Sequence, residues 1–188
     1  MSRAPVVVRE ARPEDAPALV ELWSDELRGA DAEQQRADML TVLERASADE
    51  DEQVLVAEHD GRVAGAILLR VADVSPLNLD RVVQAFAPHV APDCRRRGVG
   101  RTLMDAAVVH AEERGIGFVG SASMHTSRDA NRFFARLGLG PLAVLRIAPT
   151  PKARQKLVEH LPRGRRAAGS RPLGQVLAAR RSMRRHGY

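Results

Sequence analysis

The stretch QAFAPHVAPDCRRRGVGRTLMDAAVVHAEERG, residues 84–115, decides the fold of this chain. Its pattern predicts a strand that ends near Val90, a loop rich in arginine and glycine over residues 95–100, and a helix that ends at Gly115. The apolar side chains of the predicted helix fall on one face: Val99, Leu103, Ala106 and Ala107. The chain is therefore organised around a strand, a glycine-rich turn and an amphipathic helix.

The turn has the chemistry of an anion site. The first N–H groups of a helix lack intrahelical partners, and the helix dipole adds partial positive charge at that end. Gly98 and Gly100 carry no Cβ atom, so an anionic group can approach the backbone directly. Four arginines surround these glycines: Arg95, Arg96, Arg97 and Arg101. We expect this loop to bind a pyrophosphate.

Two common nucleotide-binding motifs do not fit the spacing. A dinucleotide-binding fold needs a third glycine three residues after the second, and this chain has Leu103 there. A P-loop needs Gly-Lys followed by Ser or Thr after four spacer residues, and the sequence contains no such run. The anion site belongs to another class of protein.

Residues 90–92 (Val-Ala-Pro) and 95–100 (Arg-Arg-Arg-Gly-Val-Gly) resemble the acetyl-CoA signature of the GNAT superfamily of N-acetyltransferases, which is Gln/Arg-x-x-Gly-x-Gly/Ala after Val-x-Pro. Residues 8–15 are similar to the usual start of the family, and residues 127–139 keep the frame of its last helix. The resemblance implies an α/β fold whose mixed, mostly antiparallel sheet is flanked by helices. It also implies that the fourth and fifth strands splay apart.

The remaining patterns agree with this fold. Asp60-Gly61 between two apolar runs predicts a hairpin, and Pro88 predicts a bulge in the fourth strand because proline cannot donate a ladder hydrogen bond. We expect strands at residues 6–9, 53–58, 62–71, 81–90, 116–124 and 142–148, and helices that begin near residues 13, 33, 99, 128 and 151.

By the resemblance, acetyl-CoA is the acetyl donor and a primary amine attacks its thioester directly. The backbone N–H groups near His89 and Val90 would pair with the pantetheine arm and polarise the thioester carbonyl. The resemblance implies cofactor contacts by these residues: His89, Val90, Ala91, Arg95, Arg96, Arg97, Gly98, Val99, Gly100, Arg101, Thr102, Ser127 and Phe134.

Two positions depart from the family pattern. Phe134 stands where a tyrosine commonly protonates the departing CoA thiolate, and Ser127 stands where an asparagine often contacts CoA. Three explanations are open: water or another group supplies the proton, Ser127 or Tyr188 does so, or the protein binds acetyl-CoA without catalysis. Activity is favoured, because direct transfer depends chiefly on positioning two reactants and polarising a carbonyl.

A general base is also needed, because an alkylamine is mostly protonated near neutral pH. His89 and His125 are the candidates by their pKa range, although either one alone is more often a structural or surface residue. Asp80 and Gln84 are further candidates on the fourth strand. Cys94, beside the arginines at a helix start, is the least favoured candidate as an acetylated nucleophile. We expect no metal site.

Composition sets the broad class. With 188 residues, 44% hydrophobic and 28% charged, the chain can bury a core of its own. A single cysteine, and the lack of a signal peptide or apolar span in the sequence, predict a cytoplasmic protein without membrane contact.

Charge divides the chain into two parts. Residues 149–188 contain eleven Lys or Arg and one acid, Glu159, whereas residues 1–148 carry a net negative charge. We expect a GNAT domain over residues 1–148 and a basic, partly helical or disordered C-terminal extension over residues 149–188. The acidic part favours a cationic acceptor, which is a small-molecule or protein amine. Two alternatives stay open: a non-catalytic acetyl-CoA-binding regulator, and an RNA- or ribosome-associated module whose tail contacts phosphates. A homodimer is also open.

Overall fold

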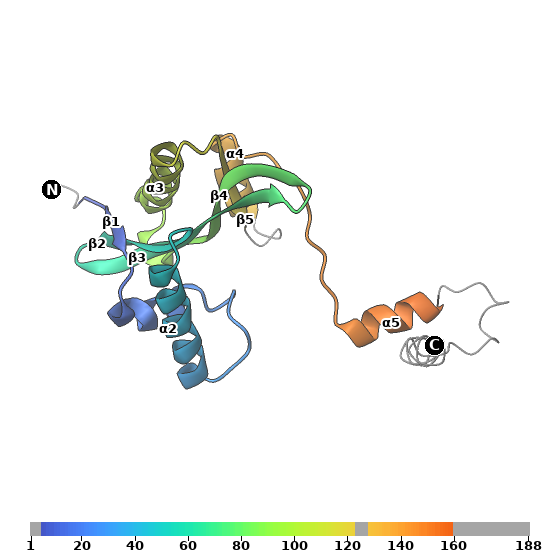
Figure 1. Cartoon of the computed structure of the whole chain (residues 1–188). Coiled ribbons are helices and arrows are strands. Elements are labelled where there is room, and N and C mark those ends of the chain that lie inside the picture. The colour runs from blue at the N-terminus through green and yellow to red at the C-terminus, as the bar shows by residue number, and fades with distance from the viewer. Residues whose placement is uncertain (1–4, 123–127, 160–188) are drawn as a thin grey trace, which may run out of the picture. The chain divides into compact units, whose positions relative to one another are not determined.

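The structure is a computed structural model that describes residues 5–122 and 128–159. The chain divides into two compact units, residues 1–140 and residues 141–188. The first unit contains β1 (Val7–Glu10), α1 (Ala16–Leu22), α2 (Ala32–Ala48), β2 (Glu52–His59), β3 (Arg62–Ser75), β4 (Asn78–Val90), α3 (Val99–Glu113), β5 (Phe118–Ala122) and α4 (Arg128–Arg136) (Figure 1). The second unit contains α5 (Thr150–Glu159).

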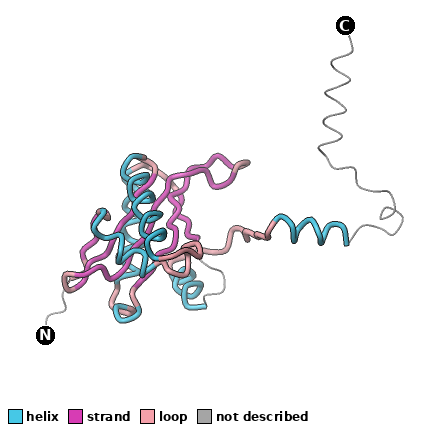
Figure 2. Tube along the Cα trace, turned by 90° about the horizontal axis from the view of Figure 1, so that it is seen from below, coloured by secondary structure: helices cyan, strands magenta, loops and turns pink. Residues whose placement is uncertain are grey.

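The five strands form one open sheet in the order β1-β2-β3-β4-β5. The first three ladders are antiparallel, and β4 pairs with β5 in parallel. The prediction of a mixed, mostly antiparallel sheet is confirmed. The β3–β4 hairpin is long, and its tip lies outside the helices, where Leu77 is fully exposed (Figure 2).

Helices cover both faces of the sheet. One apolar cluster joins α1 and α2 to the sheet through Leu19, Met39 and Val56. The other cluster joins α3 and α4 to the opposite face through Leu103 and Phe134. Figure 1 shows α2 and α3 on opposite sides of the strands. Because both faces are covered, β2 is buried almost continuously instead of in alternation.

Local signals in the sequence fix several boundaries. Asp31 caps α2, since its carboxylate accepts a hydrogen bond from the Gln34 N–H at 2.9 Å. Asp60 and Gly61 take positive φ values of 53° and 72°, as a two-residue hairpin turn between β2 and β3 requires. The predicted hairpin is confirmed.

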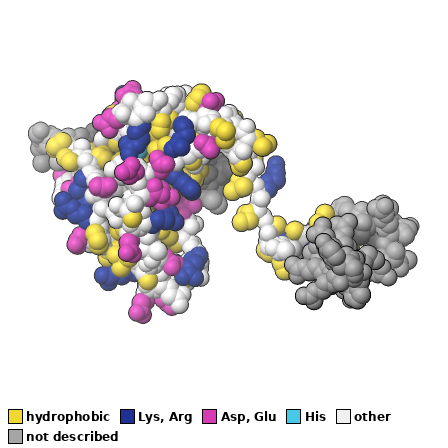
Figure 3. Space-filling model, viewed as in Figure 1, with side chains coloured by type: hydrophobic (Ala, Val, Ile, Leu, Met, Phe, Trp, Pro, Cys, Tyr) yellow, Lys and Arg dark blue, Asp and Glu magenta, His cyan; other side chains and the backbone are white. Residues whose placement is uncertain are grey.

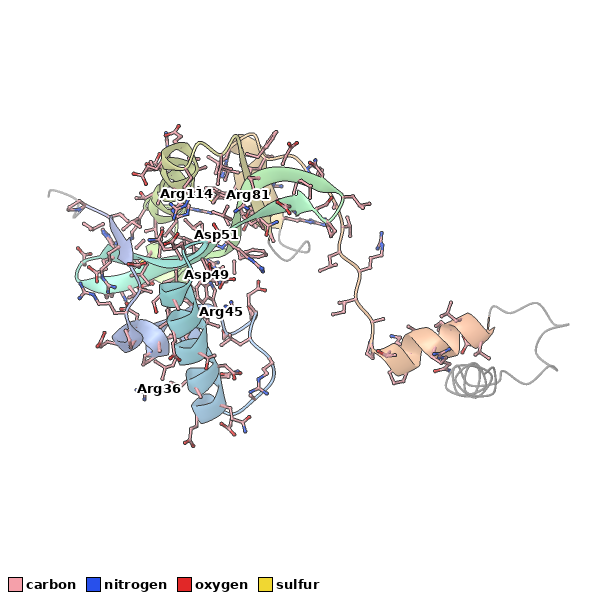
Figure 4. All side chains as sticks on the ribbon, in the orientation of Figure 1. Arg36, Arg45, Asp49, Asp51, Arg81 and Arg114 are labelled. Atoms are coloured by element: carbon pink, nitrogen blue, oxygen red, sulfur yellow. The ribbon has the colours of Figure 1, made fainter. Side chains whose placement is uncertain are left out.

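Ion pairs tie the turn between α2 and β2 to the rest of the first unit. Asp51 lies 3.1 Å from Arg81, which stands in β4 just before the residues paired with β5. Arg114, at the end of α3, donates to the Glu50 carbonyl at 3.1 Å. Arg45 of α2 pairs with the buried carboxylate of Glu52 at 2.7 Å. Figure 4 labels Arg45, Asp49, Asp51, Arg81 and Arg114 around this turn, whereas Arg36 lies toward the other end of α2.

The predicted strand over residues 142–148 is not formed. The described residues 140–149 contain neither helix nor strand, and Leu145 and Ile147 are each 94% exposed. An apolar run forms a strand only where a neighbouring strand accepts its ladder bonds, and the described ranges contain none paired with it. The apolar side chains of this segment therefore face solvent (Figure 3). The boundary at residue 148 stays a prediction.

The described part of the chain has no helix with both the length and the apolar character needed to cross a membrane. Acidic and basic side chains are interspersed over the visible face of the first unit (Figure 3).

Candidate functional site

The fourth strand changes its partners at Ala87. Residues 82–86 pair with β3 on one edge and with β5 on the other. Among the described residues, pairing with β5 ends at Phe86 and Ala122, whereas β4 continues beside β3 to Val90. Ala87 and Pro88 together stand opposite the single residue Ile67, which is a β-bulge. The bulge predicted from Pro88 is confirmed.

The bulge has an unusual backbone and an unexpected partner. Ala87 has a φ of 42°, a left-handed conformation that is uncommon for residues other than glycine. Its carbonyl accepts a hydrogen bond from the indole Nε1 of Trp23 at 2.7 Å. Sequence analysis did not assign Trp23 to the site. The one feature of the sequence that could have drawn attention to Trp23 is that it is the only tryptophan of the chain, which is a weak signal.

Strand alternation decides which backbone groups are available beyond the bulge. The Ala91 N–H donates to the Ala64 carbonyl at 2.9 Å, so this residue faces β3. His89, two residues earlier and paired with Ala66, faces β3 as well. The intervening N–H of Val90 then points to the opposite edge of β4, where no described residue pairs with it.

The arginine-glycine loop follows directly. A short 3₁₀ turn, Pro92–Cys94, precedes it, and α3 begins at Val99. Arg96 and Gly98 take positive φ values of 60° and 93°, and such alternation between left- and right-handed residues turns successive N–H groups toward one side. No heavy atom lies within 4 Å of the position that a Cβ of Gly98 would take. All four arginines of the loop are exposed. The loop is thus an open, cationic turn at a helix start.

The β2–β3 hairpin contacts this loop through side chains next to its turn. The Arg97 Nη1 lies 3.5 Å from the Nε2 of His59, a side chain that is 4% exposed. Arg62 pairs with Asp93 in the turn before the loop. The Arg62 guanidinium holds the pKa of the Asp93 carboxyl below its usual range. The residues on either side of the hairpin turn, His59 and Arg62, therefore contact the loop and the 3₁₀ turn before it.

Cys94 lies beneath the loop and is only 1% exposed. The Arg62 Nη2 is 3.7 Å from its Sγ. A nucleophilic thiol must be reached by its substrate, so this burial argues against an acetylated cysteine.

The other candidates are dispersed. His89 is half-buried beside the bulge. Asp80 is exposed at the beginning of β4, and Gln84 lies in the part of β4 that pairs on both edges. His125, Ser127 and Tyr188 lie outside the described residues. Only His89 of the candidate bases is therefore described next to the bulge.

The two phenylalanines of α4 have different surroundings. Phe134 is 8% exposed and belongs to the apolar core. Phe133 meets it edge-on, with ring centroids 5.4 Å apart. A Cβ on Gly100 would lie 3.6 Å from the Phe133 ring, so Phe133 packs over the start of α3. Sequence analysis did not assign Phe133 to the site.

Within residues 5–122 and 128–159, no three side chains of His, Cys, Asp or Glu converge as possible metal ligands.

Comparison with known proteins agrees with the geometry. Residues 16–139 match the model of the acetyltransferase (GNAT) family. A search of curated protein sequences finds no match.

Solved structures share the fold at low sequence identity. A transcriptional regulator from Bacillus halodurans is 19% identical, with a TM-score of 0.67 over 77% of this chain and 100% of that chain. A ribosomal-protein-alanine N-acetyltransferase from Brucella melitensis is 17% identical, with a TM-score of 0.61 over 77% and 99%. An aminoglycoside N-acetyltransferase in complex with CoA is 16% identical, with a TM-score of 0.65 over 79% and 97%. At such identities the likeness establishes the fold alone.

Proposed function

Since the chain belongs to the GNAT acetyltransferase family, whose acetyl donor is acetyl-CoA, we propose that it transfers the acetyl group to a primary amine by direct attack on the thioester. One observation carries the proposal: the open cationic loop before α3 follows directly after residues 87–90 of β4, which pair with β3 but with no second strand among the described residues. The two features match the two ends of a ligand with a pyrophosphate and an extended amide arm.

The cofactor contacts follow from this arrangement. The pyrophosphate is held by backbone N–H groups at the start of α3 and by the exposed side chains of Arg95, Arg96, Arg97 and Arg101. The pantetheine arm lies along residues 87–90 of β4, and the Val90 N–H polarises the thioester carbonyl. Thr102 contributes by stabilising the first turn of α3, because its hydroxyl donates to the Gly98 carbonyl at 3.2 Å.

The proposed transfer step consists of one bond formed, one bond broken and two proton transfers. The amine nitrogen forms a bond to the acetyl carbon, the carbon–sulfur bond breaks, and the electron pair leaves with the CoA sulfur. The proton of the attacking amine passes to a base, for which His89 is the half-buried candidate beside the bulge. The thiolate takes its proton from water or another group, Ser127 or Tyr188, since Phe134 offers none.

The acceptor is proposed to be a cationic amine. Two structural relatives are named for amine acceptors, an aminoglycoside and the alanine of a ribosomal protein. The net negative charge of residues 1–148 attracts such an acceptor and not an anionic one. Homodimer formation and contact of the basic tail with nucleic acid stay predictions.

A second candidate is an acetyl-CoA-responsive regulator without turnover. It is favoured by Phe134, which cannot donate a proton, and by the relative that is named a transcriptional regulator. Both candidates use the same cofactor site. Turnover on a panel of primary amines separates them, because only the enzyme releases free CoA.

The site is tested by calorimetric titration with acetyl-CoA, which needs no acceptor. The wild type should show saturable one-site binding. Gly98→Glu should weaken it by about 100-fold or more, because a carboxylate would stand where phosphates bind. Gly138→Glu is a matched control, because Gly138 has a similar φ of 82° and equally open surroundings at the end of α4. Equal affinity of the Gly98→Glu variant and the wild type would contradict the site, and absence of wild-type binding would contradict the function.

A further inference from the structure

The hydrogen bond between Trp23 and Ala87 joins the end of α1 to the bulge of β4, directly after the last described pair of β4 with β5. The indole Nε1 donates to the Ala87 carbonyl at 2.7 Å, and the Trp23 side chain is 5% exposed. An indole has one donor and no acceptor, and a buried donor needs a partner. The Ala87 carbonyl is the partner that this donor finds.

Ala87 needs such support because of its backbone. Its φ of 42° places it in the left-handed region, where the Cβ of an L-residue approaches the following carbonyl oxygen. In the G1 type of β-bulge, where the first bulged residue is left-handed, that residue is usually glycine, which has no Cβ. A residue held in that conformation persists only when its surroundings fix it. The cost of the conformation is similar in size to the net contribution of one hydrogen bond.

Trp23 is itself held rigidly. Its N–H donates to the Leu19 carbonyl at 2.9 Å, and its own carbonyl accepts from the Glu26 N–H at 2.8 Å. Its ring belongs to the apolar cluster of α1, α2 and the sheet, in which Met39 is also buried. The indole therefore presents its N–H from a fixed position.

We propose that Trp23 is a positioning residue of the acetyl-CoA site. Its indole N–H holds Ala87 in the left-handed bulge and thereby fixes the backbone of residues 87–90, whose edge opposite β3 receives the pantetheine arm. This inference rests on the proposed function. Trp23 acts through Ala87, so its effect is confined to the acetyl and pantetheine half of the ligand and does not reach the arginine-glycine loop.

The test uses the full chain, two ligands and four variants. The ligands are acetyl-CoA and its nucleotide half, ADP with a 3′-phosphate, which reaches the loop but not the bulge. Trp23→Phe keeps an aromatic ring and removes the donor. It should weaken acetyl-CoA binding by about tenfold and leave the affinity for the nucleotide half unchanged.

The decisive variant adds Ala87→Gly. Glycine adopts the left-handed conformation without strain, so it should make the indole hydrogen bond unnecessary. Trp23→Phe combined with Ala87→Gly should bind acetyl-CoA within about threefold of the Ala87→Gly single variant. Leu43→Ala is the control for general destabilisation, because Leu43 is buried in the same apolar cluster and comes from α2. It should lower the unfolding midpoint without changing the dissociation constant.

The outcomes separate the two proposals. Unchanged acetyl-CoA affinity in Trp23→Phe would overturn the positioning role, and so would a loss that Ala87→Gly does not reduce. A loss shared equally by both ligands, or reproduced by Leu43→Ala, would also overturn it. If the wild type binds neither ligand, the proposed function fails and this inference fails with it.

Discussion

The two parts of β4 on either side of the bulge differ in their neighbours. Residues 82–86 have a strand on each edge, and Val83 and Ala85 are fully buried. Residues 87–90 have β3 on one edge, include a left-handed alanine and are half-buried throughout. The first part has ladder partners on both edges, whereas the second has a ladder partner on one edge only among the described residues. The comparison teaches that the proposed site lies where the described β4–β5 ladder stops, because a strand edge without a ladder partner can pair with a ligand.

The largest effect is expected from a methyl group added in contact with residues 87–90, called here the one-sided part of β4; residues 82–86 are called the two-sided part. A Cβ on Gly65 would lie 2.7 Å from the His89 carbonyl oxygen and 2.8 Å from Val99 Cγ1. Gly65→Ala should therefore displace β4 or α3 and lower the free energy of unfolding by about 2 kcal/mol. Urea denaturation measures this change. Gly120→Ala is the matched control in β5, beside the two-sided part, because its Cβ would lie 3.5 Å from Val82 Cγ2, an ordinary contact.

Gly120→Ala should change the free energy of unfolding by less than about 0.5 kcal/mol. If both glycines tolerate alanine equally, residues 87–90 are not held tightly against β3 and α3, and the contrast between the two parts of β4 disappears.

A smaller effect is expected at the loop into which the one-sided part leads. Arg97→Gln should weaken acetyl-CoA binding by about tenfold, because a charge-assisted contact to phosphate is lost. His59→Leu removes the acceptor 3.5 Å from Arg97 and should weaken binding less, whereas His59→Gln can keep an acceptor and should lie between His59→Leu and the wild type. Calorimetry measures all three dissociation constants.

Two controls accompany the loop variants. Arg36→Gln removes the same charge from an exposed position of α2 and should leave the affinity unchanged (Figure 4). In the Arg97→Gln background, His59→Leu should have no further effect. An additional loss there would mean that His59 does not act through Arg97.

The smallest effect is a pH dependence at the other end of α3. Burial, and then the charge of Arg114, lower the pKa of His110. The unfolded chain then binds this proton more readily, so the folded state loses stability as the pH falls below about 6.5 and keeps it above. Urea denaturation at pH 7.5 and 5.5 measures the loss, and His110→Gln should reduce the difference. An equal loss in that variant would assign the effect to other groups.

The sequence was sufficient for the features that depend on local chemistry. Asp60-Gly61 fixed the hairpin, Pro88 marked the bulge, and the spacing of Gly98 and Gly100 marked the helix start. Each of these residues imposes its conformation through its own backbone restrictions, so no distant partner has to be known.

The features that depend on distant partners could not be predicted. Trp23 meets Ala87 across 64 positions of the chain, and nothing in the local pattern of α1 singles out its N–H. Residues 142–148 have a strand-like apolar pattern, yet a strand needs a neighbour, and sequence periodicity does not report whether one is present. The packing of Phe133 over Gly100 could not be predicted either, because it depends on how α4 is placed against α3 in the folded chain.

The order of the strands in the sheet has a consequence for folding kinetics. β2, β3 and β4 follow one another through two-residue turns, at residues 60–61 and 76–77, whereas β5 joins β4 only after the crossover through α3. Short loops close fast and at little entropic cost, and long ones close later. We therefore expect β2, β3 and β4 to pair first. The edge of β4 on which we place the pantetheine arm is then formed, through its pairing with β3, before β5 arrives.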